Sequence, residues 1–116
     1  MWVVEAGNEL IATMTISWPA EDTLQALTHE ASVQHRAWLN QLAVEPSRRK
    51  QGIARLLRDE GFAWSASQGA SSVGLDTAKP ATHLVELYSS WGFRIVDEVQ
   101  WPGKSYRSVV MVRDLA

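Results

Sequence analysis

The chain contains no cysteine in its 116 residues. Disulfide bonds, thiolate catalysis and zinc sites built on cysteine are therefore excluded. An acyl-cysteine intermediate is excluded for the same reason, and the sequence shows no serine triad. The three histidines, at positions 29, 35 and 83, have none of the spacings that are typical of metal ligands, such as H-E-x-x-H. We therefore expect no metal.

Long apolar runs are also missing. No stretch approaches the roughly 18 apolar residues of a membrane span. The first five residues, Met-Trp-Val-Val-Glu, lack the cationic start and apolar stretch of a signal peptide. We expect a cytoplasmic protein with no membrane partner. Hydrophobic residues make up 46% of the chain and charged residues 21%, which is typical of a globular protein, and we expect residues 1–116 to form a single domain.

Charge is nearly balanced overall but uneven along the chain. The formal net charge is −2, which gives nucleic acid no general attraction. Five of the eleven basic residues nevertheless fall within a short stretch, namely Arg48, Arg49, Lys50, Arg55 and Arg58. A local cationic patch on a mildly acidic chain favours a small anionic ligand over nucleic acid. The alternative is a solvated surface without a ligand.

The pattern of apolar and turn residues predicts six strands and two main helices. The strands are expected at 2–6, 10–17, 38–44, 72–77, 94–101 and 106–112, and the helices at 52–67 and from about 81 to 91. The strand at 38–44 is expected to be largely buried. Between Trp18 and Arg36 the pattern is weaker: we predict a short helix that Asp22 caps and that carries Leu24 and Leu27, with a strand as the alternative. This order indicates an α/β fold built on a mixed sheet.

The helix predicted at 52–67 is the clearest one, and it follows an unusual segment. Its apolar positions have a 3.6-residue repeat, with Ile53, Leu56, Leu57, Ala63 and Trp64. A buried strand and a short basic loop precede it, and it opens at a glycine. The first N–H groups of a helix have no partners within the helix and form an anion site, which a phosphate approaches closely where glycine removes the side chain. Walker A and G-x-G-x-x-G patterns are absent.

Two stretches carry a family resemblance. The segment from Leu42 to Leu57 has the pattern Leu-Ala-Val-x-Pro-x-x-Arg-x-x-Gly-x-Ala-x-x-Leu, which resembles the acetyl-coenzyme A segment of the GNAT N-acetyltransferases. Further on, Leu87 to Phe93 resembles the family's Leu-Tyr-x-x-x-Gly-Phe. The resemblance covers residues 38–112 and implies the GNAT-like fold, a mixed, mostly antiparallel sheet flanked by helices. By this resemblance the chain starts at what would be the family's second strand, so the family's first strand and the two helices after it have no counterpart in this sequence.

The resemblance implies a binding role for two groups of residues. The backbone of Leu42, Ala43 and Val44 would pair with the pantetheine arm of acetyl-coenzyme A. The pyrophosphate would bind to the loop and first helical turn, which comprise Arg49, Lys50, Gln51, Gly52, Ile53, Ala54 and Arg55. These roles agree with the chemistry, because an amide chain matches an open strand edge and a pyrophosphate matches a helix N-terminus.

Tyr88 is the candidate general acid. A phenol with an ordinary pKa of about 10 stays protonated at neutral pH and can protonate a departing thiolate. The alternative is a tyrosine whose ring only packs in the core. The general base is not identified: many family members have an acidic residue just before the Leu-Ala-Val segment, whereas this chain has Asn40 and Gln41. Glu45, one of the histidines or a chain of water molecules remain alternatives.

The functional hypothesis is an N-acetyltransferase that transfers an acetyl group from acetyl-coenzyme A to a primary amine by direct attack. The alternative is a non-catalytic acyl-coenzyme A binding module, or a partial site that a partner subunit completes. Six tryptophans, of which Trp2, Trp18 and Trp101 are predicted at strand ends, favour a homodimer, although they serve equally to cover a small core. The acceptor is unknown, and no nucleic-acid partner is expected.

Overall fold

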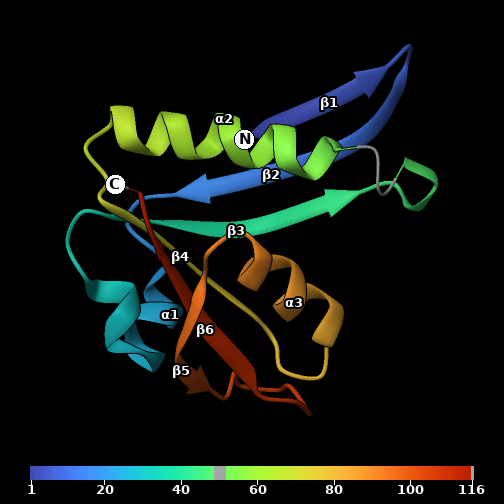
Figure 1. The fold of residues 1–116 in the computed structure, drawn as a ribbon. Helices are drawn as coiled ribbons and strands as arrows, with labels where there is room; N and C mark the ends of the chain where they lie inside the picture. The colour runs from blue at the N-terminus through green and yellow to red at the C-terminus, as the bar shows by residue number, and fades with distance from the viewer. Residues whose placement is uncertain (49–51, 116) are drawn as a thin grey trace.

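The computed structural model describes residues 1–48 and 52–115, which form a six-stranded sheet with the strand order β1-β2-β3-β4-β6-β5 (Figure 1). The strands are β1 (Trp2–Ala6), β2 (Glu9–Ser17), β3 (Arg36–Val44), β4 (Ser72–Ala78), β5 (Arg94–Val99) and β6 (Ser108–Asp114). The helices are α1 (Asp22–Leu27), α2 (Ile53–Ser67) and α3 (Thr82–Ser90), with short 3-10 turns η1 (His29–Ser32) and η2 (Pro46–Arg48). β3 and β4 are parallel, and the other neighbouring strands are antiparallel. The predicted mixed, mostly antiparallel sheet is confirmed.

Helices cover both faces of this sheet. The larger buried cluster joins strand residues such as Leu39 and Met111 to residues of α2 and α3. The smaller cluster joins Trp38 and Val110 to Leu24 of α1. Because successive strand residues point to opposite faces, the pairs 38/39 and 110/111 place the two clusters on opposite sides of the sheet. We call these sides the α2/α3 face and the α1 face.

The buried side of α2 differs from the predicted one. Leu57 is buried as expected, but Leu56 is 55% exposed and Trp64 is 39% exposed. The remaining buried positions of the helix are Gly61, Phe62 and Ser65. A Cβ atom at position 61 would overlap the side chains of Met14 and Ile16 in β2. Small residues therefore let the helix approach the sheet closely, and a search for apolar residues does not find them.

The connection between β2 and β3 contains the predicted short helix, with Leu24 buried. Asp22 is not its cap, however, because Glu21 occupies that position without a side-chain bond and Asp22 begins the first turn. The turn η1 was not predicted. The hydroxyl of Thr28 donates a hydrogen bond of 2.6 Å to Asp97 Oδ2 and so links this connection to β5. No helix within residues 1–48 or 52–115 has the length and apolar character needed to cross a membrane.

The last hairpin has a longer loop than predicted. β5 ends at Val99 and β6 begins at Ser108, so residues 100–107 form the connection. The side-chain amide of Gln100 donates to three carbonyl oxygens of this loop, those of Trp101, Lys104 and Tyr106, at 3.3, 2.8 and 3.0 Å. These bonds satisfy backbone groups inside the loop. Residues 100–101 and 106–107, which were predicted to lie in strands, therefore belong to the loop instead.

Candidate active site

The central feature of the sheet is a fork between β3 and β4. The two strands pair only from Arg36–Leu39 to Ser72–Leu75, although β3 continues to Val44 and β4 to Ala78. Figure 1 shows the two strands diverging beyond this point. Over residues 40–44 one edge of β3 pairs with β2, while no described strand pairs with the other edge. The predicted burial of β3 is therefore wrong for this half, where Asn40, Gln41 and Ala43 are exposed.

A β-bulge lies at the base of the fork. Ile16 of β2 pairs with Leu39 and Thr15 pairs with Gln41, so Asn40 is an extra residue on β3. A bulge bends its strand and shifts the alternation of side chains by one position. After the shift, Leu42 and Val44 pack against the same cluster as Leu39. The bulge thus keeps the α2/α3 face apolar at the point where β3 leaves β4.

The N-terminus of α2 follows the end of β3. Gly52 is exposed in the N-cap position with φ +79°, a left-handed conformation that glycine adopts without strain. The N–H of Leu56 donates to the Gly52 carbonyl oxygen at 3.0 Å, so the N–H groups of residues 53–55 lie at the positive end of the helix. Ile53 and Ala54 pack against the same cluster as Leu42. The predicted ligands Arg49, Lys50 and Gln51 lie outside the described residues.

Tyr88 lies in α3 on the same face. Its side chain is 7% exposed and belongs to the cluster that contains Leu39 and Leu75, the last paired residues of the fork. The ring contacts Trp91 and Phe93 edge to face, with centroid distances of 5.6 and 5.9 Å. Burial raises the pKa of the Tyr88 phenol, which keeps the hydroxyl protonated over the physiological range. The packing role is therefore established, and the acid role stays a prediction.

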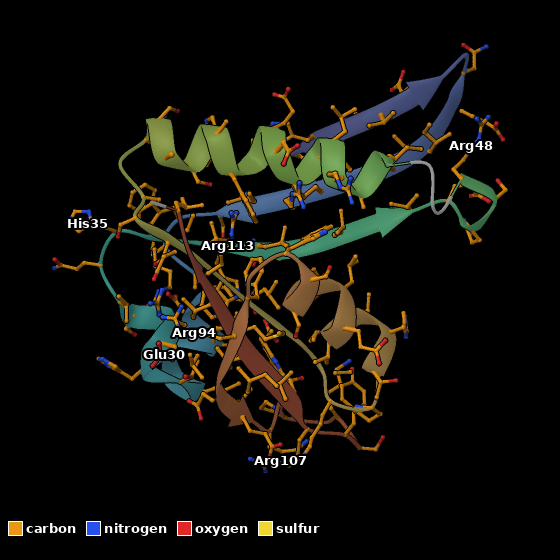
Figure 2. The ribbon with its side chains drawn as sticks, in the orientation of Figure 1. Glu30, His35, Arg48, Arg94, Arg107 and Arg113 are labelled. Atoms are coloured by element: carbon orange, nitrogen blue, oxygen red, sulfur yellow. The ribbon has the colours of Figure 1, made fainter. Side chains whose placement is uncertain are left out.

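The described members of the basic cluster, Arg48, Arg55 and Arg58, have different surroundings in the structure. Arg58 pairs with Asp59 at 2.8 Å and lies 5.2 Å from the ring centroid of Trp91, so it is a structural residue of α2. Arg55 is exposed in the first turn of α2. Arg48 is half-buried on the η2 turn, beyond the end of β3 (Figure 2).

The candidates for the general base are scattered. Glu45 follows β3 and its N–H donates to the Ile11 carbonyl oxygen at 2.7 Å. Figure 2 places His35 at the opposite end of β3, before the strand begins. His29 is exposed in η1 and His83 is exposed in the first turn of α3. The amide of Asn40 donates to the Ser17 hydroxyl at 2.8 Å, so this position offers no basic group to a substrate.

Asp76, which directly follows Leu75 at the fork, carries a carboxylate that no sequence motif predicted as part of the site. Its Oδ1 accepts a hydrogen bond of 3.3 Å from the Trp38 indole, and its Oδ2 accepts one of 2.8 Å from the Trp101 indole. Trp38 belongs to the α1 face, so the carboxylate lies on the side of the sheet opposite Tyr88. An acidic residue at the end of an apolar strand was the available signal, but its partners are distant in sequence.

The chain that contains this fork has a clear family assignment. A sequence model described as "Acetyltransferase (GNAT) family" matches residues 1–93. The chain therefore belongs to the GNAT acetyltransferase family. No curated protein matches this sequence.

Solved structures share the fold. The ribosomal-protein-S18-alanine N-acetyltransferase from Escherichia coli is 16% identical with a TM-score of 0.72, over 97% of this chain and 66% of that one. Ard1 from Thermoplasma volcanium is 17% identical with a TM-score of 0.77, over 95% and 66%. A Bacillus subtilis acetyltransferase in complex with CoA is 19% identical with a TM-score of 0.70, over 98% and 75%. The chain thus spans 66% of the first two structures, and at these identities the likeness concerns the fold.

Proposed function

We propose that this chain transfers an acetyl group from acetyl-coenzyme A to a primary amine by direct attack. The observation that carries the proposal is the open edge of β3 at residues 40–44, which lies next to the positive end of α2. An amide chain that ends in a pyrophosphate matches these two features in the order in which they occur. The family match and a structural neighbour in complex with CoA support the same cosubstrate.

The cosubstrate is assigned to two groups of residues. The pantetheine amides would pair with the backbone of Leu42, Ala43 and Val44, as a short strand added to the sheet. The pyrophosphate would accept hydrogen bonds from the N–H groups at the start of α2, at residues 52–55. The neighbouring Arg49, Lys50 and Gln51 are proposed to complete this anion site on the evidence of the sequence.

The proposed reaction has two proton transfers. A primary amine with a pKa of about 10 arrives as ammonium and must first lose a proton. Its nitrogen lone pair then attacks the thioester carbon, the carbon–sulfur bond breaks, and the sulfur leaves as a thiolate. Tyr88 is proposed to give this thiolate its phenolic proton, since its ring belongs to the same buried cluster as Leu39 and Leu75 at the base of the fork. For the first proton, Glu45, a histidine and water remain the candidates.

A second function has one observation in its favour. Asn40 and Gln41, at the point where β3 leaves β4, carry no titratable acid. A non-catalytic acyl-coenzyme A binding module would have this property. Turnover separates the two functions, because a binding module holds acetyl-coenzyme A without releasing free thiol whichever amine is offered.

The single domain over residues 1–116 and the homodimer are also proposals. Trp2, Trp18 and Trp101 are half-buried, so the indole surface at the strand ends is smaller than the sequence suggested. Exposed apolar surface remains at Leu56 and Trp64 of α2. Light scattering at micromolar concentration would show twice the mass of the chain if the dimer forms.

The test of the proposed function is calorimetric titration with acetyl-coenzyme A. The Gly52→Trp variant is expected to lose binding at least 100-fold, because an indole would occupy the approach to the first turn of α2. Gly7→Trp is a matched control, because Gly7 (φ +62°) and Gly52 (φ +79°) both have positive φ and open surroundings. The two substitutions should therefore introduce similar backbone strain. Gly7→Trp should bind normally. Absence of binding to the unmodified chain would refute the proposal.

A further inference from the structure

A cavity opens on the α1 face of the fork. Its volume is about 400 Å³, and its lining includes Asp76, Thr77, Trp101, Lys104 and Tyr106. It begins one residue beyond Leu75, the last residue of β4 that pairs with β3. The cavity therefore reaches the base of the fork from the side opposite Tyr88. Its lining comes from β4, the loop after β5 and the start of β6, and β3 reaches it through the Trp38 indole, which donates to Asp76 at 3.3 Å.

The cavity contains an oriented negative charge. Each oxygen of Asp76 accepts a single indole hydrogen bond, from Trp38 or Trp101, and a carboxylate oxygen can accept further bonds. Among the described residues, no cationic side chain forms an ion pair with Asp76. Aromatic rings of Trp101 and Tyr106 line the same cavity. A carboxylate between aromatic rings is suited to an ammonium group, which interacts with both.

The cavity lining also carries a positive charge. Two cations that adjoin lining residues in the chain, Lys79 and Arg107, both pair with Glu98 at 2.7 Å. Lys104 takes part in none of the ion pairs found in the described residues, and it lines the cavity. The bonds from Gln100 to the carbonyl oxygens of the loop fix the backbone that carries Lys104. The cavity lining thus combines a carboxylate that two indoles hold with one exposed ammonium group.

We propose that this cavity is the acceptor site and that the acceptor is a small amine that also carries an anionic group such as a carboxylate. Asp76 holds the ammonium end near the fork, and Lys104 holds the anionic end. The inference rests on the proposed function, which supplies the acetyl group. The cavity volume lies in the range of small-molecule sites, about 300–1,000 Å³. Asp76 orients the amine, which then loses its proton and attacks as described above.

The probe is 4-aminobutyrate, compared with butylamine and butyrate, which each keep one of its two charges. Because the Trp38 and Trp101 indoles both donate to Asp76, their N–H signals in nitrogen-15 NMR spectra should shift when an ammonium group binds. The Trp2 and Trp64 indoles, which contact each other on the other side of the molecule's core, should not shift. Among the three compounds, 4-aminobutyrate should bind tightest, at least tenfold tighter than butylamine.

Two variants separate the two charges. Asp76→Asn keeps the shape and one acceptor oxygen, and it should weaken 4-aminobutyrate and butylamine at least tenfold. Lys104→Gln, at an exposed position, should weaken 4-aminobutyrate at least tenfold, to the level of butylamine, and leave butylamine unchanged. Equal binding of the two amines, or indole signals that do not respond, would overturn the inference. Since this titration needs no acetyl-coenzyme A, a chain that binds 4-aminobutyrate but fails the calorimetric test would refute the proposed function and not the zwitterion site.

Discussion

The two faces of the β3–β4 fork differ in chemical character. On the α2/α3 face, Leu42, Val44 and Tyr88 belong to a continuous apolar cluster. On the α1 face, Asp76 and Lys104 place opposite charges around one cavity. A thioester on a pantetheine arm is neutral, whereas an amine at neutral pH is an ion. In the proposed arrangement, one break in the sheet offers an apolar face to the neutral thioester and a charged face to the amine.

The two tyrosines of the chain provide the strongest test of this comparison, because one lies on each face. Tyr88→Phe should lower kcat by about 100-fold, a typical effect of losing a general acid, with little change in the KM for either substrate. Tyr106→Phe keeps the ring that lines the cavity, so it should leave both kcat and the KM for the amine nearly unchanged. The measurement is release of free thiol under saturating acetyl-coenzyme A. Similar kcat values for the two variants would contradict the assigned acid.

The same pair of variants sharpens the comparison through stability at high pH. Burial raises the pKa of Tyr88 in the folded protein, while the phenol of an unfolded chain ionises near pH 10. Below that pH both states keep the proton and the shift has no effect. Above it the unfolded state loses the proton first, so the free energy of unfolding falls as pH rises toward the folded pKa.

Tyr88→Phe should remove this part of the fall, and Tyr106→Phe should retain it. Denaturant unfolding of both variants between pH 9 and pH 11 would measure the difference. A parallel decline in the two variants would mean that the Tyr88 hydroxyl is as well solvated as that of an exposed tyrosine.

A smaller effect concerns the hydrogen bond that links the β2–β3 connection to β5. The Thr28 hydroxyl lowers the pKa of Asp97, together with the Glu98 N–H, so this carboxylate stabilises the folded state above its ordinary pKa and loses that contribution as pH falls. Thr28→Val removes this bond and the 3.2 Å bond that Thr28 Oγ1 accepts from the Glu30 N–H, so it should cost about 1–2 kcal/mol at pH 7. It should also flatten the loss of stability below pH 4. The exposed Thr23→Val in α1 is the control. Equal acid profiles would show that the contact contributes nothing.

Patterns local in sequence predicted most of the fold. The hairpin at Gly7, the helix start at Gly52 and the apolar positions of α3 follow from residue conformation and periodicity. The fork did not follow, because the residue at which β3 and β4 part depends on tertiary packing. The bulge at Asn40 is likewise visible only in the register with β2.

The candidate site shows the same division. The resemblance assigned Leu42 to Val44, Arg49 to Arg55 and Tyr88. Of these, Leu42, Val44, Ile53, Ala54 and Tyr88 belong to or pack against the larger apolar cluster. Asp76 was missed because its environment is made by residues 38 and 101, which lie 38 and 25 positions away. A charge pair across a cavity has no periodicity and no spacing that a sequence pattern can detect.

The edge of β3 that no described strand covers also affects how readily the chain aggregates or is degraded. An exposed strand edge is a template for association with other chains, and natural proteins usually cover it. Here the cover would be the acyl donor itself, whose amide arm takes the place of a missing strand. Ligand binding stabilises the folded form in proportion to its concentration relative to Kd. We therefore expect the resistance of this protein to aggregation and proteolysis to rise and fall with the supply of acetyl-coenzyme A.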